Sequence, residues 1–132
     1  MAITINGNGS ITGLSAGGLP DGSVTTDDLA SSVQTQLCKA WVNFNGTGTV
    51  AIRANYNVSS ITDNGTGNYT VNFSNALADA NYSAVCGYKP SSSSTYVANI
   101  SSQSSSTLTC YFLNYANGLS LDQTIVNIAV FR

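Results

Sequence analysis

Residues 69–74 read Tyr-Thr-Val-Asn-Phe-Ser, and this short stretch decides the fold class of the chain. Large apolar side chains occupy every second position, and small polar side chains lie between them. Because successive side chains of a β-strand point to opposite faces, the pattern predicts a strand with one buried and one exposed face. The same alternation recurs at Leu108, Cys110 and Phe112. The C-terminal region is therefore expected to form strands.

Outward from this stretch, residues 38–132 carry strand-like runs separated by Gly and Asn turns. We expect eight strands, at residues 40–45, 49–54, 57–61, 69–74, 82–88, 96–101, 107–113 and 124–131. Short strands at this spacing predict an all-β fold, an antiparallel β-sandwich with a jelly-roll-like order. The last run is apolar on both faces except at Asn127, which predicts a central strand or a subunit interface.

Residues 1–37 form a separate segment of different composition. Residues 1–23 are rich in Gly and turn residues, and their apolar residues are too few for a core. We expect an extended arm that lies on another protein. The apolar residues expected to dock it are Ile3, Ile5, Ile11, Leu14 and Leu19.

A helix is expected from about residue 25 to residue 37. Thr25 fits the N-cap, and Asp28 three positions later completes a capping box. The apolar stripe of this helix is narrow and consists of Leu29, Val33 and Leu37. Such a stripe suits a small bundle of identical helices, because a lone helix of this length is marginal in water. The alternative is a helix packed on its own domain.

Charged residues make up 8% of the 132 residues, against about 25% in typical globular domains. The formal net charge is −2, and there is no His. Four basic residues give no electrostatic footprint for nucleic acid, and mechanisms that need imidazole are excluded. No apolar run predicts a membrane span, and the N-terminus lacks a secretory-signal pattern. Weak charge repulsion favours oligomerisation.

The three cysteines are Cys38, Cys86 and Cys110. Their spacing does not match a zinc site, so no metal or other cofactor is expected. Cys86 and Cys110 both fall in strand-like runs and could be disulfide-bonded or free. Buried free thiols are the commoner state, and sequence alone does not choose between the two.

Enzymatic motifs are weak. Residues 13–17 match G-x-S-x-G, but they lie in the turn-rich arm of a chain without His. A polysaccharide hydrolase needs two carboxylates, and Asp63 with Asp79 or Asp122 is the remaining combination. Asp in turns usually bonds the backbone, so we expect no enzymatic activity.

A binding surface is the stronger expectation. Tyrosines, Asn and Ser gather in two strand connections, a composition that combines rigid contact area with adaptable hydrogen bonds and suits sugars. The candidate receptor-binding residues are Tyr88, Lys89, Ser93, Tyr96, Tyr115 and Asn117. The alternative is that these tyrosines close the end of the sandwich.

Three stretches resemble a known family. Residues 11–30, with Gly17-Gly18-Leu19-Pro20-Asp21-Gly22, resemble the attachment segment of bacteriophage tail-fibre proteins. Residues 39–50, beginning Lys-Ala-Trp-Val-Asn-Phe, and residues 56–67, ending Thr-Asp-Asn-Gly-Thr-Gly, resemble the start of their distal β-domain.

The resemblance implies a homotrimeric virion fibre, made in the host bacterial cytoplasm. Its arm would dock on other virion proteins of the tail, baseplate or capsid. Its helices would form a trimeric neck, and its sandwiches would form a knob that meets a host-surface glycan. Similar modules also occur as head fibres or capsid decorations, which is the structural alternative without a receptor. The resemblance supplies no catalytic residues.

Overall fold

The computed structural model describes residues 4–5, 11–12, 24–25, 28–34, 36–89 and 96–132. The chain separates into two compact units, residues 1–35 and residues 36–132. Among the described residues, none of the helical segments could span a lipid bilayer.

In the first unit, β1 (Thr4–Ile5) pairs antiparallel with β2 (Ile11–Thr12), with Ile5 opposite Ile11. Of the predicted docking residues, these two isoleucines lie in the paired strands. The other three lie outside the described residues and are Ile3, Leu14 and Leu19.

The expectation of a helix over residues 25–37 is wrong in extent, because α1 covers only Ser31–Gln34. The Asp28 carboxylate accepts hydrogen bonds from the Thr25 N–H (2.7 Å) and hydroxyl (2.8 Å). The Asp28 N–H donates to the Thr25 carbonyl at 3.2 Å, which closes a tight turn. Ser31, Ser32, Val33 and Thr35 follow this turn in the sequence, and such residues propagate a helix poorly.

The predicted trimerisation stripe therefore does not lie on one helix. Val33 lies in α1, whereas Leu29 precedes it and Leu37 follows it. Val33 and Leu37 are exposed in the single chain, and Leu29 is half-buried.

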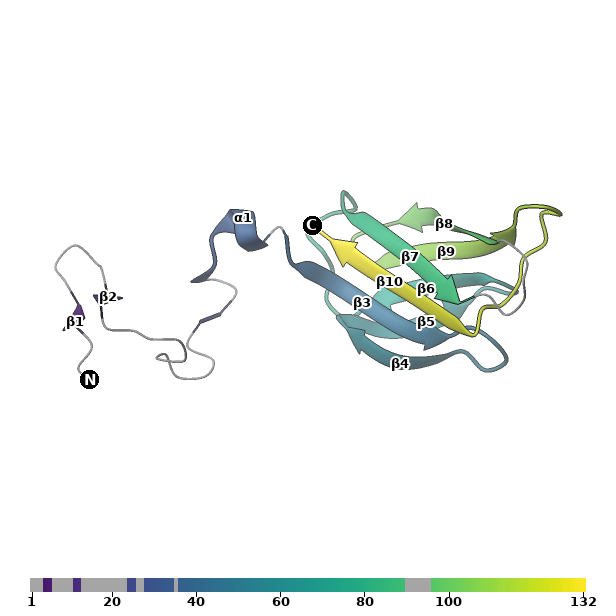
Figure 1. Ribbon diagram of the computed structural model, residues 1–132, viewed down its shortest axis with the longest axis horizontal. Helices are drawn as coiled ribbons and strands as arrows, with labels where there is room; N and C mark the ends of the chain where they lie inside the picture. The colour runs from purple at the N-terminus through teal and green to yellow at the C-terminus, as the bar shows by residue number, and fades with distance from the viewer. Residues whose placement is uncertain (1–3, 6–10, 13–23, 26–27, 35, 90–95) are drawn as a thin grey trace. The chain divides into compact units, whose positions relative to one another are not determined.

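The second unit is a sandwich of two four-stranded antiparallel sheets, which confirms the predicted all-β class (Figure 1). One sheet has the order β4-β3-β10-β7 and is called the β3–β10 sheet. The other has the order β5-β6-β9-β8 and is called the β6–β9 sheet. The strands are β3 (Cys38–Asn45), β4 (Ala51–Tyr56), β5 (Val58–Asp63), β6 (Asn68–Phe73), β7 (Ser83–Lys89), β8 (Tyr96–Gln103), β9 (Thr107–Asn114) and β10 (Ile125–Phe131).

The strand order corrects the jelly-roll-like part of the prediction. β3–β4, β5–β6 and β8–β9 are hairpins between neighbours in one sheet. In a jelly roll, by contrast, most consecutive strands lie in opposite sheets. The chain passes from β4 to β5 through Asn57 alone, whose φ of 54° lies in the left-handed region that Asn tolerates. This tight corner places β4 and β5 at facing edges of the two sheets.

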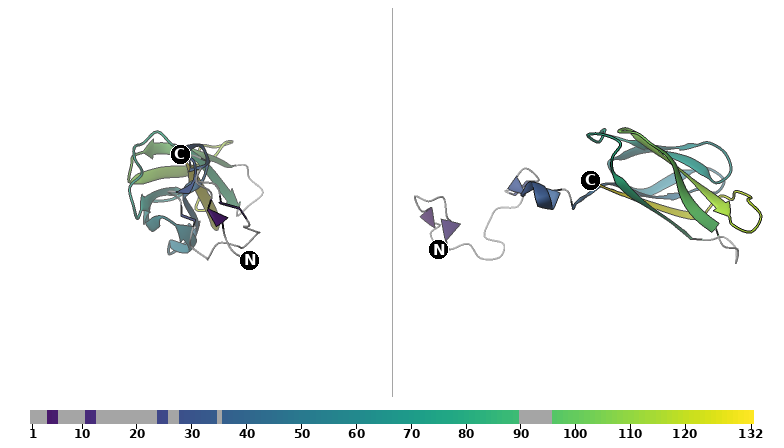
Figure 2. Two further views of the ribbon diagram at one scale, coloured as in Figure 1. Left: turned by 90° about the vertical axis from the view of Figure 1, so that its left-hand side faces the viewer. Right: turned by 90° about the horizontal axis from the view of Figure 1, so that it is seen from above.

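The alternating pattern of residues 69–74 does define the core. Tyr69, Val71 and Phe73 are buried, while the residues between them are half-buried. The ring of Tyr69 packs edge-on against Phe44 of the opposite sheet, with centroids 5.2 Å apart. The two layers are seen from above in the right-hand view of Figure 2. Buried apolar side chains of both sheets fill the space between them.

β10 lies in the middle of its sheet, as its apolar sequence predicts. Val126, Ile128 and Val130 point into the core, while Asn127 and Phe131 are exposed on the outer face. Cys38 and the C-terminus lie at one end of the sandwich, and the β9–β10 connection lies at the other end (Figure 1). We call these the Cys38 end and the far end.

Candidate binding surface

A groove of about 420 Å³ lies on the outer face of the β6–β9 sheet, towards the far end. Strands β8 and β9 supply its floor, because Val97 pairs with Leu113 and Asn99 pairs with Tyr111. All four positions are on the outward side of the alternating pattern, since their neighbours Leu108, Cys110 and Phe112 are buried. The groove is lined by Val97, Asn99, Tyr111, Leu113, Asn114, Tyr115 and Gly118, none of which is charged.

The β9–β10 connection forms the wall of this groove and is held by its own hydrogen bonds. The Gly118 N–H donates to the Asn114 carbonyl at 2.9 Å, and Gly118 has a φ of 70°. The Asn114 side chain accepts the Ala116 N–H, and the Asn117 side chain accepts the Leu119 N–H at 3.1 Å. These bonds shape a closed turn that carries Tyr115 outward, where 83% of its surface is exposed.

The predicted receptor residues divide into two groups. Tyr115 and Asn117 belong to the turn beside the groove, and Lys89 is exposed at the end of β7. Tyr88 instead joins the two sheets. Its hydroxyl donates to the Tyr96 carbonyl and accepts the Tyr96 N–H at 3.1 Å. Its ring packs on Phe112 with centroids 5.5 Å apart. Ser93 lies outside the described residues.

Sequence reasoning missed the floor of the groove. Asn99 and Tyr111 are 12 residues apart in the chain and meet only because β8 and β9 pair in this register. The available signal was their outward position in two strands whose inward positions are apolar. Position in a strand does not show which exposed residues are gathered into a hollow.

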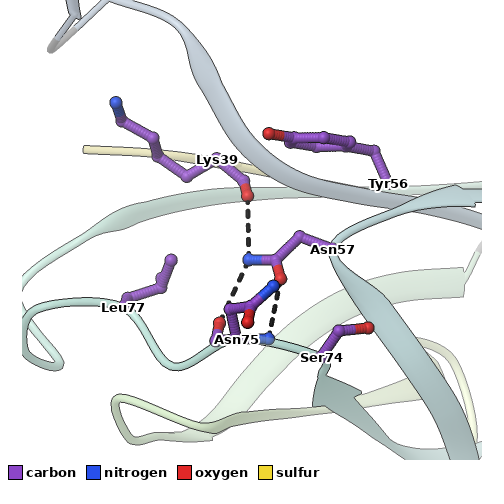
Figure 3. Close-up of a pocket in the computed structure, with 6 residues that line it drawn as sticks. All are labelled: Lys39, Tyr56, Asn57, Ser74, Asn75 and Leu77. Carbon is purple, nitrogen blue, oxygen red and sulfur yellow. Dashed lines mark hydrogen bonds between the residues drawn. The ribbon is translucent and has the colours of Figure 1, made fainter. Parts of the chain in front are cut away.

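A second hollow, of about 390 Å³, lies at the Cys38 end and is shown in Figure 3. The side chain of Asn57 crosses it and bonds both neighbouring segments. Its amide donates to the carbonyls of Lys39 (3.2 Å) and Asn75 (3.1 Å), and its oxygen accepts the Asn75 N–H at 2.8 Å. The polar centre of this hollow is therefore engaged in holding the β4–β5 corner, beside the exposed ring of Tyr56.

The third feature is an apolar row across the outer face of the β3–β10 sheet. The pairing register aligns Tyr56 of β4 with Trp41 of β3, and Trp41 with Ala129 of β10. Ala129 is in turn aligned with Val85 of β7. Trp41 is 39% exposed, Tyr56 57% and Val85 61%. This apolar row spans all four strands without a charged side chain.

The carboxylates singled out for hydrolysis each hold local structure. Asp63 accepts the Gly65 N–H at 2.9 Å. Asp79 accepts the Asn81 N–H at 2.7 Å and pairs with Arg132, and these contacts lower its pKa, the backbone bond most strongly. Asp122 accepts the Gly67 N–H and the Tyr69 hydroxyl, both at 2.7 Å. Within the described residues, no cluster of three His, Cys, Asp or Glu side chains could hold a metal ion.

No protein-family model, curated protein or solved structure matches this chain.

Proposed function

We propose that this chain is a fibre protein of a bacteriophage virion. Residues 1–37 attach it to the particle, and residues 38–132 form a trimeric knob that recognises carbohydrate on the host surface. The observation that carries the receptor role is the uncharged groove between Asn99, Tyr111 and Tyr115. It lies towards the end of the sandwich opposite the one at which the chain enters at Cys38.

The chemistry of the groove fits a neutral sugar. Tyrosine rings offer flat faces to the C–H faces of a pyranose, and hydroxyl and amide groups offer hydrogen bonds to its hydroxyls. The absence of charge among the lining residues favours a neutral ligand over a phosphate or an acidic sugar. A groove this shallow binds one sugar weakly, so three copies in one fibre would raise the avidity.

The apolar row supports assembly through the sandwich. Trp41, Tyr56 and Val85 leave a contiguous apolar band exposed on one chain, a feature that usually marks an interface. We assign a second copy of this chain as its occupant, because the resemblance implies a homotrimer and the low charge opposes association weakly. The four-residue α1 is too short to hold three chains together alone.

Binding of the purified full chain to an array of bacterial surface polysaccharides tests the receptor role. Tyr111→Ala and Tyr115→Ala should each reduce binding at least tenfold. Thr66→Ala, at an exposed turn position outside the groove, is the matched control and should bind as the wild type does. Equal binding by all four proteins would overturn the assignment of the groove.

A structural role as a head fibre or capsid decoration is the second candidate. It is favoured by Tyr88 and Tyr96, two of the predicted receptor tyrosines, whose mutual bonds close the sandwich. Immunogold electron microscopy of virions with antibody to residues 38–132 separates the two. Label at the tail tip would support the receptor role, and label over the capsid would support decoration.

A further inference from the structure

Cys86 and Cys110 lie in opposite sheets and meet inside the sandwich. Cys86 is on β7 of the β3–β10 sheet, and Cys110 is on β9 of the β6–β9 sheet. Cys110 is fully buried, and Cys86 is partly buried and packs against the same core. Two residues further along the same inward faces, the rings of Tyr88 on β7 and Phe112 on β9 pack against one another across the sheets, with centroids 5.5 Å apart. This packing places Cys86 opposite Cys110. From this arrangement we infer that Cys86 and Cys110 are a redox-active pair that forms an inter-sheet disulfide on reaction with a small-molecule disulfide.

At this edge, a side chain of β7 reaches the other sheet directly. Packed sheets are on average about 10 Å apart, whereas the Cα atoms of a disulfide are about 4.4–6.8 Å apart. Two residues from Cys86, on the same face of β7, the Tyr88 hydroxyl reaches the backbone of Tyr96 on β8. A side chain thus bridges directly from β7 to the other sheet beside the cysteine pair.

The two thiols differ in the way that the reaction requires. A hydrogen bond from the facing Cys110 thiol favours the thiolate of Cys86 and so lowers the pKa of Cys86. The same bond, with burial, raises the pKa of Cys110. Cys86 is also the more accessible of the two. It is therefore the attacking thiolate, since the thiolate is the nucleophilic form.

The reaction is a double thiol–disulfide exchange. The Cys86 thiolate attacks one sulfur of the small disulfide, whose S–S bond breaks, and one small thiolate leaves. Cys110 then loses its proton and attacks Sγ of Cys86, and the second small thiolate leaves. The two cysteines are oxidised to one disulfide, and the two leaving thiolates take up the two protons that the cysteines lose, so the small disulfide is reduced to two thiols.

The link would join two sheets that otherwise meet mainly through side-chain packing. It closes a loop of about 25 residues, which stabilises a folded domain by restricting the unfolded chain. A reducing compartment keeps the pair open, and an oxidising compartment closes it. The redox state of the surroundings would therefore set the stability of the sandwich.

The test uses the full chain with Cys38→Ser, which leaves only the proposed pair. The protein is incubated with oxidised glutathione, and its free thiols, intact mass and Tm are measured. We expect the thiols to fall from two to none, with no glutathione adduct, and the Tm to rise by roughly 10 °C or more. Peptide mapping without reductant should recover residues 86 and 110 in one linked species, and reductant should reverse every change.

Retention of both thiols, or a stable glutathione adduct on Cys86, would overturn the inference. A second variant, with Cys38→Ser and Cys110→Ala, should stop at the mixed disulfide on Cys86 and show no such rise in Tm. Disulfide formation at the same rate in urea-unfolded protein would also count against it, because the folded contact would then contribute nothing.

Discussion

The hydroxyl oxygen of Tyr69 lies 2.7 Å from Oδ1 of Asp122, although 53 residues separate the two in the chain. The same carboxylate oxygen accepts the N–H of Gly67, and the hydroxyl also lies 2.9 Å from the carbonyl oxygen of Gly46. One buried phenol and one carboxylate thus tie three chain segments together at the far end of the sandwich. The turns that shape this end depend on that network.

Gly46→Ala should destabilise the sandwich by about 2–3 kcal/mol. A Cβ at this position would lie 2.6 Å from the Tyr69 hydroxyl and 2.9 Å from the Gln123 carbonyl oxygen. Gly87→Ala is the control, because its Cβ would meet nothing within 4 Å. Urea denaturation monitored by Trp41 fluorescence measures both. Equal urea midpoints for the two variants would show that the structure around residue 46 adjusts to the added Cβ with no loss of stability.

Tyr69→Phe should lower the free energy of unfolding near pH 7 by about 1–2 kcal/mol, since it removes the bond to Asp122. Burial, together with the bond and charge of Asp122, raises the pKa of Tyr69 in the folded state. The resulting stability is complete below the unfolded-state value near pH 10 and is lost as the pH rises above it. Wild type should therefore lose more stability than Tyr69→Phe between about pH 9 and pH 11. Parallel pH profiles would contradict this.

Arg132→Gln should raise the pKa of Asp79 only part of the way to the ordinary value of an Asp carboxyl. The pKa of the Asp79 carboxyl is lowered first by the Asn81 N–H and then by Arg132. Because a lowered folded-state value gives stability that is lost as the pH falls through it, the effect lies in the acid range below about pH 4. NMR titration of the Asp79 carboxyl measures it in both proteins. A return to the ordinary value in Arg132→Gln would assign the whole effect to the ion pair.

Tyr88→Phe should lower the stability of the sandwich, whereas Tyr115→Ala should leave it almost unchanged. Tyr88→Phe removes the bonds to the Tyr96 backbone and should cost about 1–2 kcal/mol of stability. Tyr115→Ala truncates a side chain that is 83% exposed and should change stability by less than about 0.5 kcal/mol. Thermal unfolding of both variants tests the division between structural and surface tyrosines. A larger loss in Tyr115→Ala would show that the turn depends on its ring.

Trp41→Asp together with Val85→Asp should reduce the assembly proposed above to single chains. The two carboxylates would place charge in the middle of the apolar row, where burial against a second copy is costly. Light scattering gives the mass, with Thr62→Asp on the outer face of the other sheet as the control. A second pair, Leu29→Asp and Val33→Asp, should leave the mass unchanged. Loss of assembly in this second pair alone would assign it to the N-terminal segment.

The positions of the sandwich strands and the side chains on each strand face follow from local sequence pattern. Residues 69–74 alternate, and their apolar members are the buried ones. The final strand is apolar on both faces, and it is central in its sheet. These features are local, because a period of two decides which side of a strand faces the core. Thr25 and Asp28 do form the hydrogen bonds that their spacing predicts, but these bonds close a turn and do not begin a long helix.

The choice of neighbouring strands, and of the side chains that meet across them, depends on tertiary packing. The groove forms only in the observed register of β8 on β9. The apolar row forms only when four strands pair side by side, and Cys86 faces Cys110 only because the two sheets pack together. Alternation along a strand is compatible with many strand orders, and these orders differ in long-range pairings that leave no local pattern. The sequence therefore determined a sandwich with its inner and outer residues, and the packing of its strands decided where its surfaces and its thiol pair lie.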